Sequence, residues 1–184
     1  MKVLFVCLGN ICRSPMAEAV FREKVSKEGL DDVIQLSSRA TSNWNEGDMP
    51  HRGTRRKLDA KGIDYDGIIS EQIQDKDFED YDYIIGMDQQ NVEDLKQLAP
   101  DKSYHDKIYP FLSEVVGLDY QEVPDPYYTG DFDETFSLVD KGSQAWLDYF
   151  LNCNIKLATL IKISKYQCYF IEPLTYQHVL IFRF

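Results

Sequence analysis

Basic residues are too few in this chain to suit a nucleic-acid binder. Its 184 residues include 20 Lys and Arg against 31 Asp and Glu, which gives a formal net charge of −11. Nucleic acids and anionic membrane surfaces both select proteins with basic faces, so we expect neither as a partner. Any phosphate group that this protein binds must therefore be held in a local pocket.

Cysteine, histidine and long apolar runs are scarce as well. Four cysteines are far fewer than a disulfide-rich secreted scaffold carries, and neither they nor the three histidines have the spacing of a metal site. We therefore expect no metal and no cofactor. No apolar stretch approaches the length of a membrane span, and the run near the N-terminus is too short for a signal-peptide core. The sequence predicts a cytoplasmic protein whose thiols stay reduced.

Apolar runs that alternate with amphipathic stretches predict an α/β fold. "KVLFVC" is a continuous apolar run typical of a strand buried on both faces of a parallel sheet. Strands are expected at 2–7, 33–38, 81–87 and 107–112, and helices at 14–27, 51–62, 90–99 and 134–151. This alternation implies right-handed βαβ units and three layers, with helices on both faces of the sheet. Ligands bind such sheets at the carboxyl ends of the strands.

Residues 152–184 differ in composition from the rest of the chain. They contain few acidic residues, are rich in Ile, Tyr and Phe, and end in "HVLIFRF", which has the low charge and β-propensity of an aggregation-prone segment. We interpret residues 1–151 as one domain and residues 152–184 as an atypical extension without a catalytic role. The alternative is that the extension contains a docking or oligomerisation strand.

The loop "CLGNICR", between the first predicted strand and the first predicted helix, has the composition of an anion cradle. Its main-chain N–H groups can point inward, and the start of the helix adds the positive end of its dipole. Gly9 and Asn10 are the residues that most readily take the left-handed backbone angles of a tight nest. Arg13 can bind two phosphate oxygens with its guanidinium group. We therefore expect the loop residues Leu8, Gly9, Asn10, Ile11 and Cys12 to bind the substrate.

Cys7 is expected at the floor of this cradle, where the same positive field favours the thiolate. The hydroxyl of Ser14 can donate a hydrogen bond to that thiolate, and Ser14 can also cap the following helix. A C-x5-R pattern often arises by chance, and a cysteine on an apolar strand is usually a packing residue. The strand before it, the Gly-Asn pair within it and the Ser-Pro helix start after it favour a nucleophile.

A thiolate that attacks phosphorus needs an acid to protonate the leaving oxygen. The stretch "VPDPYY" offers Asp125 between two prolines, which stiffen the loop. Tyr127 and Tyr128 can form an aromatic wall for an aryl substrate. The alternative interpretation of Asp125 is a simple Asp-Pro turn.

Four basic residues also cluster in one predicted helix: Arg52, Arg55, Arg56 and Lys57. They can guide acidic phosphopeptides toward the cleft. A run of this kind is more commonly a solvated helix face.

Together, "VCLGNICRSPMAEAVF" and "VPDPYY" resemble the signature and the general-acid loop of the low-molecular-weight protein tyrosine phosphatases. The resemblance covers roughly residues 1–151 and implies a four-stranded parallel sheet flanked by helices. It implies that Cys7 is a nucleophile that forms a phosphocysteine intermediate. It also implies that Arg13 binds the phosphate, and that Asp125 protonates the leaving phenol and later activates water.

The same resemblance implies roles for supporting residues. Asn10 and Ser14, together with Ser38, match positions that hold the loop and the thiolate. Cys12 matches a cysteine that forms a reversible disulfide with the nucleophile under oxidation. Ile68 stands where many members have a histidine, which removes one supporting hydrogen bond.

Trp44 matches an aromatic position at the entrance of the site, which Tyr127 and Tyr128 complete. The implied substrate is a tyrosine-phosphorylated protein or peptide, and we expect a monomer.

A phosphoarginine phosphatase of the same fold is the main alternative, although similar proteins there carry Thr in place of Ile11 and lack the Tyr-Tyr pair. An arsenate reductase would need a further redox cysteine pair, which residues 81–90 lack. A non-catalytic phosphate or phosphotyrosine binder is the remaining alternative.

Overall fold

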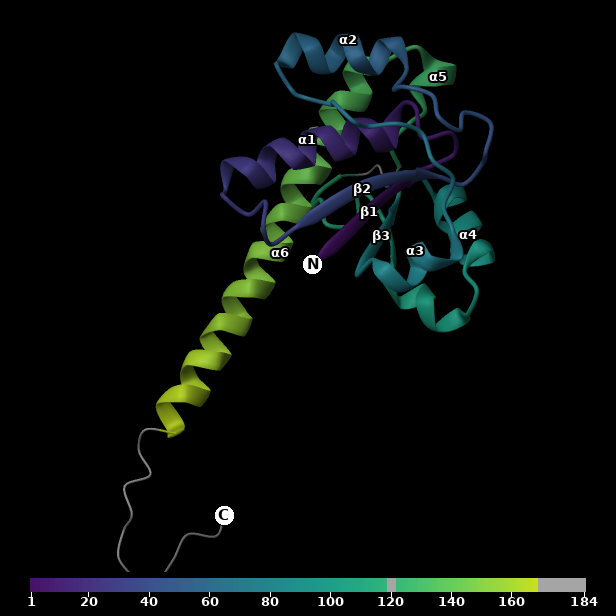
Figure 1. Cartoon of the computed structure of the whole chain (residues 1–184). Coiled ribbons are helices and arrows are strands. Elements are labelled where there is room, and N and C mark those ends of the chain that lie inside the picture. The colour runs from purple at the N-terminus through teal and green to yellow at the C-terminus, as the bar shows by residue number, and fades with distance from the viewer. Residues whose placement is uncertain (119–121, 169–184) are drawn as a thin grey trace, which may run out of the picture. The chain divides into compact units, whose positions relative to one another are not determined.

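The computed structural model describes residues 1–118 and 122–168, with side chains as far as Asn152. Four strands and seven helical segments follow one another along this part of the chain (Figure 1). They are β1 (Lys2–Cys7), α1 (Arg13–Lys27), β2 (Gln35–Ala40), α2 (Arg52–Lys61), α3 (Asp75–Asp80), β3 (Tyr83–Gly86), α4 (Gln89–Leu98), the 3₁₀ helix η1 (Lys102–Lys107), β4 (Ile108–Pro110), α5 (Pro126–Thr129) and α6 (Phe132–Cys168).

All four strands are parallel, in the order β2-β1-β3-β4. This confirms the predicted four-stranded parallel sheet of an α/β fold. The chain leaves β1 toward β2 on one side and later returns to β3 on the other side, so the strand order reverses at β1. A crevice forms at the carboxyl ends of the strands at such a point, and ligands bind there in open α/β sheets.

Side chains of β1 alternate between the two faces of the sheet, and helices cover both faces (Figure 1). Leu4 and Val6 belong to a buried cluster with residues of α3 and α4. Phe5 points to the opposite face, where its ring centroid lies 5.5 Å from that of Phe21 in α1 and 5.9 Å from that of Phe111. Each fully buried side chain of this size contributes about 1.5–3 kcal/mol. β1 is thereby fixed on both faces, and so is the loop that follows it.

The second strand begins later than the sequence indicated. Residues 33–38 were expected in it, but β2 spans Gln35–Ala40. The N–H groups of Val33 and Ile34 both donate to the carbonyl of Leu30, at 2.9 Å each. A turn therefore uses the backbone groups that the strand would need.

The first helix begins at Arg13, and Cys12 occupies the N-cap position without a side-chain capping bond. The prediction that Ser14 caps this helix was wrong. Ser14 lies in the first turn of α1, and its hydroxyl lies beside Cys7 instead.

Three short helical segments, α3, η1 and α5, were not expected from the sequence. None exceeds six residues, which is too short to show an apolar period. α3 is instead fixed at its start, where the N–H of Gln74 donates to the Asp77 carboxylate at 2.8 Å and the N–H of Asp77 donates to the Gln74 carbonyl at 2.9 Å. Caps of this kind position short segments that periodicity does not reveal.

α6 begins near the expected position and continues past residue 151, where the domain boundary is predicted. The chain divides into two compact units, and the first ends at Leu147. In this first unit, the indole N–H of Trp146 donates to the carbonyl of Phe111 at 2.8 Å. The proposed docking strand at the end of the chain lies outside the described residues. Within those residues, no helix combines the length and the apolarity needed to cross a membrane.

Candidate active site

The loop formed by residues 8–12 turns its carbonyl groups outward. Four of them accept hydrogen bonds from residues beyond the loop: Leu8 from Ser42, Gly9 from Asn45 and Ser70, Ile11 from His51, and Cys12 from Thr54. By contrast, none of the main-chain N–H groups of residues 8–12 donates to another group in the described part of the chain. Successive unpaired N–H groups at the start of a helix form an anion-binding concavity. We call residues 7–14 the cradle loop.

Asn10 makes the left-handed turn of the cradle loop. Its φ is 49°, and it is the one residue other than glycine with a positive φ among the described residues. Its Nδ2 donates to the hydroxyl oxygens of Ser14 and Ser38, at 2.8 Å each, and its Oδ1 accepts from the N–H of Glu71 at 3.1 Å. These bonds join α1, β2 and the segment before α3 around one buried side chain.

Gly9 was also expected to adopt left-handed angles, and this expectation was wrong, because its φ is not positive. A side chain there would displace Asn45. A Cβ atom on Gly9 would lie 2.6 Å from Nδ2 of Asn45, the same amide that donates to the Gly9 carbonyl. The residue must be small so that Asn45 can hold the loop.

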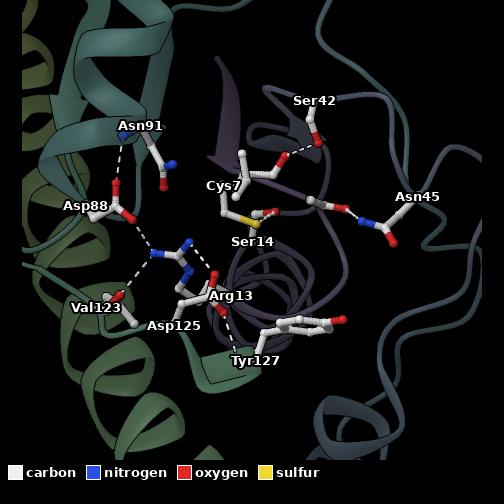
Figure 2. Close-up of polar contacts among 12 residues, drawn as sticks. Cys7, Arg13, Ser14, Ser42, Asn45, Asp88, Asn91, Val123, Asp125 and Tyr127 are labelled. Carbon is white, nitrogen blue, oxygen red and sulfur yellow. Dashed lines mark hydrogen bonds and ion pairs between the residues drawn. The ribbon is translucent and has the colours of Figure 1, made fainter. Parts of the chain in front are cut away.

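Cys7 is the last residue of β1 and is buried at the carboxyl edge of the sheet. Its Sγ lies 3.1 Å from the hydroxyl oxygen of Ser14, and Figure 2 shows the two side chains next to each other. A hydroxyl in that position can donate to a thiolate. Cys7 also lines a pocket of about 330 Å³ together with Leu8, Gly9, Ile11, Cys12, Trp44, Asn45, Asp125, Tyr127 and Tyr128.

This pocket brings together nine of the residues singled out from the sequence. Four further residues that the sequence predicts to support the cradle are buried and do not line the pocket: Asn10, Arg13, Ser14 and Ser38. Three aromatic side chains at the pocket are solvent-exposed: Trp44 by 74%, Tyr127 by 62% and Tyr128 by 75%. The rings of Tyr127 and Tyr128 meet edge to face with centroids 5.5 Å apart. An aromatic rim around a polar floor suits a flat ligand with an anionic end.

Arg13 connects the cradle loop to two carboxylates (Figure 2). Its guanidinium donates to Asp88, to Asp125 at 2.7 Å and to the carbonyl of Val123 at 3.2 Å. Burial alone would lower the pKa of Arg13, but Cys7, Asp125 and Asp88 together outweigh it and raise the pKa. The Nε of Arg13 is buried and has no hydrogen-bond partner within the described residues. One donor of the charged group therefore remains for an added acceptor.

The two carboxylate oxygens of Asp125 make different contacts. One contact is that of an Asp-Pro turn, and the other connects Asp125 to the active site. Its Oδ1 accepts from the N–H of Tyr127 at 3.0 Å and caps α5, as an Asp-Pro turn would. Its Oδ2 binds Arg13. The N–H of Val123 donates to the carbonyl of Met87 at 2.9 Å, so the segment is anchored at the end of β3. Asp125 is thus at the pocket although it is far from Cys7 in sequence.

Asp88 is a site residue that the sequence reasoning missed. It lies two residues after the end of β3 and caps α4 by accepting from the N–H of Asn91 at 2.6 Å. An acidic residue at the carboxyl end of a central strand, just before a helix, is a usable signal. Its second oxygen holds Arg13.

Glu18 was missed as well, and it ends a buried chain of hydrogen bonds that starts at Cys7. Ser38 links the two parts of this chain, because its hydroxyl accepts from Asn10 and donates to Glu18 at 2.7 Å. Burial raises the pKa of Glu18, and the hydrogen bond from Ser38 and the charge of Arg22 oppose that rise. Ile68, at the position where a histidine was noted as missing, is a buried apolar residue.

Cys12 differs from Cys7 in its environment. Both are buried free thiols. Burial, then the charges of Cys7 and Asp125, raises the pKa of Cys12 to about 12. Cys12 is therefore a neutral thiol at ordinary pH.

Among the described residues, no group of three or more His, Cys, Asp or Glu side chains is arranged to hold a metal ion.

Comparisons with known proteins agree on one family. The family model described as "Low molecular weight phosphotyrosine protein phosphatase" matches residues 2–157. The low molecular weight protein-tyrosine-phosphatase YfkJ of Bacillus subtilis is 44% identical over 147 residues, which cover 80% of this chain and 94% of that protein. PtpA of Staphylococcus epidermidis, described in the same words, is 43% identical over 155 residues, which cover 84% of this chain and 97% of that protein.

Solved structures show the same relationship. The crystal structure of YfkJ matches with a TM-score of 0.79 and 42% identity, covering 83% of this chain and 95% of that one. The crystal structure of a drosophila arginine phosphatase matches with a TM-score of 0.76 and 31% identity, covering 82% of this chain and 98% of that one. The similarity therefore extends over nearly the whole length of these relatives.

Proposed function

The chain belongs to the low molecular weight phosphotyrosine protein phosphatase family and is a hydrolase of that class, and on this premise we propose that it hydrolyses phosphotyrosine through a phosphocysteine intermediate. The unpaired N–H groups of residues 8–12, next to the Cys7 thiol, carry the proposal. These donors fit the equatorial oxygens of a phosphoryl group in transfer, where negative charge is spread in the transition state. The unpaired Nε of Arg13 offers one more donor.

In the proposed first step, the Cys7 thiolate attacks the phosphorus of the bound ester. The S–P bond forms as the bond from phosphorus to the phenolic oxygen breaks, and Asp125 gives its proton to that oxygen. Ser14 stabilises the thiolate before attack, since its hydroxyl lies 3.1 Å from Sγ. Arg13 and the cradle N–H groups hold the phosphoryl oxygens throughout the step.

In the proposed second step, the ionised Asp125 takes a proton from a water molecule as that water attacks phosphorus. The S–P bond breaks, the Cys7 thiolate returns and inorganic phosphate leaves. One carboxyl group serves both steps because it is left ionised by the first. The cycle is complete with no metal or cofactor.

The ion pair between Asp125 and Arg13 fits this sequence of events. A bound phosphate competes with the Asp125 carboxylate for the same guanidinium, which Asp88 continues to hold from its other side. Substrate binding would then release the Asp125 carboxylate, which takes up a proton from solvent and turns toward the leaving oxygen as the general acid. Asp125 keeps its place through the α5 cap, which uses its other oxygen atom.

The aromatic rim supports phosphotyrosine over other phosphoesters. The exposed rings of Trp44, Tyr127 and Tyr128 offer flat apolar surface to an aromatic leaving group, which phosphoserine lacks. Because a drosophila arginine phosphatase is among the structural relatives, phosphoarginine is the second candidate substrate. Ile11 lines the pocket here and favours an aromatic ring over a guanidinium group.

The proposal extends to the setting of the reaction. The catalytic unit is residues 1–151, it acts as a monomer on tyrosine-phosphorylated proteins, and it works in the cytoplasm. Two neighbouring free thiols support a reducing compartment. On oxidation, Cys7 would form a reversible disulfide with Cys12, which protects the nucleophile from irreversible oxidation.

The experiment that tests the proposal compares matched peptides that carry phosphotyrosine, phosphoserine or phosphoarginine, all in the presence of EDTA. We expect the phosphotyrosine peptide to release phosphate with a kcat/KM at least about 100-fold higher than that of the other two peptides. The reason is that contacts formed in the transition state discriminate strongly between substrates. A higher kcat/KM for the phosphoarginine peptide would show that phosphoarginine, and not phosphotyrosine, is the preferred substrate. A requirement for added Mg²⁺ or Zn²⁺ would contradict the mechanism.

A further inference from the structure

α2 carries a concentration of positive charge that the proposed chemistry does not use. Five of its ten residues are basic, and one is acidic, in a chain whose net charge is −11. Its first turn contains no acidic residue, although the positive end of a helix dipole favours one there. The arginines near the N-terminus of α2 therefore reduce the stability of this helix. Charges placed against the dipole point to a role outside the helix.

A surface hollow of about 600 Å³ adjoins this end of α2. Arg52 and Arg56 line it, and none of its lining residues carries a carboxylate. Gly53 and Phe132 shape its base, because a Cβ atom on Gly53 would lie 2.4 Å from the Phe132 ring. The hollow is therefore a positively charged concavity, whereas a plain solvated helix face would be convex.

The side chains of Arg52 and Arg56 are exposed and make no ion pair or hydrogen bond to other described residues, while the charge of Arg56 contributes to lowering the pKa of Asp133. Their neighbour Lys57 differs, because it pairs with Asp133. Positive potential from the arginines also reaches His51, whose pKa is lowered by burial first and then by the charges of Arg52 and Arg55. The two unpaired arginines are available to an anionic group from outside the chain.

The hollow and the catalytic pocket share Tyr127 as a common wall. His51 connects them on the other side, since its N–H donates to the carbonyl of Ile11 in the cradle loop at 2.7 Å. A peptide whose phosphotyrosine lies against Tyr127 therefore extends its neighbouring residues toward Arg52 and Arg56.

The opposite flank of the catalytic pocket has the opposite charge. A second hollow, of about 350 Å³, lies on the Tyr128 side and contains Asp88, Asp94, Glu122 and Asp125 around Arg13. An acidic side chain of the substrate would be repelled there and attracted on the Tyr127 side. The two flanks together impose one direction on a charged peptide.

We propose that the hollow beside Arg52 and Arg56 is a subsite for a carboxylate side chain, Asp or Glu, that neighbours the phosphotyrosine in the substrate. This inference rests on the proposed phosphotyrosine phosphatase activity and names the peptide class that this activity prefers. The binding is electrostatic and solvent-exposed, so it affects kcat/KM more than kcat and weakens as salt increases.

The test uses pairs of phosphotyrosine peptides that differ only in Glu or Gln at each flanking position in turn. For the unaltered enzyme we expect at least one position at which Glu raises kcat/KM by about three- to tenfold over Gln. The variant Arg52→Gln/Arg56→Gln should bring this ratio close to one. Lys96→Gln, an exposed basic residue of α4 away from both hollows, changes the same kind of charge and should keep the full ratio.

Two results would overturn the subsite. One is a ratio near one at every position in the unaltered enzyme, and the other is a ratio that survives the double arginine variant. Turnover of the Gln peptides by the unaltered enzyme reports separately on the proposed function. If those peptides are not hydrolysed at all, the phosphatase proposal fails; if they are hydrolysed without a charge preference, the subsite alone fails.

Discussion

The cradle loop, residues 7–14, and the acid segment, residues 123–130, face the same pocket, but the first is buried and the second is largely exposed. Asn10 and Ser14 are almost completely enclosed, while Tyr127 and Tyr128 each expose more than half of their surface. Within the cradle loop, four carbonyl groups of residues 8–12 accept hydrogen bonds from residues outside it. The acid segment contacts the cradle loop through Arg13, which pairs with Asp125 and donates to the carbonyl of Val123.

This difference separates two tasks. A loop held on all sides keeps its donors in place before the substrate arrives, so little reorganisation accompanies the reaction. A segment held by one ion pair, two hydrogen bonds of the Val123 backbone and a short capped helix can change its exposed residues without disturbing that loop. We therefore expect changes in the cradle loop to affect the chemical step and folding, and changes in the acid segment to affect leaving-group and substrate dependence.

The largest effect is expected from Cys7→Ser. The hydroxyl is a far weaker nucleophile than a thiolate, so kcat should fall by at least about 10⁴-fold. The cradle N–H groups remain, and phosphate or vanadate should still bind within a few-fold of the original affinity. Phosphate release from p-nitrophenyl phosphate and isothermal titration measure the two quantities. Retained turnover in the variant would remove the thiolate from the mechanism.

Asp125→Asn is the matching change in the acid segment. Asn still accepts from the Tyr127 N–H and so keeps the α5 cap, but it has no proton to give. We expect kcat/KM to fall by about 10²–10³-fold for a poorly leaving phenol and much less for p-nitrophenol, which leaves well without protonation. Rates across a series of aryl phosphates provide the measurement. An equal loss for all leaving groups would argue against a general acid at this position.

Asn10 tests how strongly the cradle loop depends on its buried bonds. Asn10→Ala combines an unfavourable positive φ with the loss of three hydrogen bonds, and should destabilise the protein by about 2–4 kcal/mol. Asn10→Gly should recover about 1 kcal/mol of that loss, because glycine accepts the backbone angle. Urea unfolding measures both variants.

Tyr128→Ala is the control from the acid segment. The side chain is 75% exposed, so its removal should leave unfolding within about 0.5 kcal/mol of the original value while changing KM for aryl substrates. If Tyr128→Ala destabilised the protein as much as Asn10→Ala, the proposed division between a fixed loop and an adaptable segment would be wrong.

The same division explains what the sequence could predict. The cradle loop is a run of adjacent residues between a strand and a helix, so its chemistry could be read locally. Asp88 could not be found in this way, because it reaches Arg13 from 75 positions further along the chain. Asp125 was found because two prolines and two tyrosines mark it, yet the motif did not say that it also binds Arg13.

Errors in the sequence predictions have local physical causes. Gly9 and Asn10 both tolerate left-handed angles, and the sequence does not say which of two such neighbours makes the turn; the bonds of Asn10 to Ser14 and Ser38 decide it. Ser14 suits a helix cap, but the Cys7 thiol and the Asn10 amide surround its hydroxyl instead. The parallel sheet and its helical layers follow from general rules of βαβ units, which is why these features were predicted more completely than the short helices.

Cys12→Ser tests the unequal thiols within the cradle loop. Cys12 is a neutral thiol, with a pKa raised to about 12 chiefly by burial, so its replacement should change kcat less than about threefold. Under peroxide, Cys7 becomes a sulfenic acid and loses the charge that contributes to the raised pKa of Cys12. The two sulfurs can then form a disulfide and release water.

Activity recovered with a thiol reductant after peroxide measures this protection. We expect recovery to be severalfold lower in Cys12→Ser than in the unaltered enzyme. Mass spectrometry should show a Cys7–Cys12 disulfide in the oxidised original and over-oxidised Cys7 in the variant. Equal recovery in both proteins would exclude a protective role for Cys12.

The smallest effect is expected at Glu18, where the cradle loop's chain of hydrogen bonds ends. Because burial raises the pKa of Glu18, the folded protein retains a proton that the unfolded chain has already lost as the pH rises above the ordinary value of 4.5. This group's contribution to stability is therefore greatest at low pH and declines as the pH rises through the folded-state pKa. Glu18→Gln cannot ionise and should lack that decline, although its side chain can still accept from Ser38.

Thermal unfolding across the acidic to neutral range measures the difference, which should amount to a few degrees in Tm at most. Glu23→Gln removes the same charge from a more exposed position on α1 and is the control. The quantity to compare is the difference in Tm between each variant and the unaltered protein. If this difference changes with pH more for Glu18→Gln than for Glu23→Gln, the titrating group is the buried carboxyl of Glu18. Parallel curves for both variants would show that the pH dependence arises elsewhere, and the chain from Cys7 to Glu18 would then be only a structural support for the cradle loop.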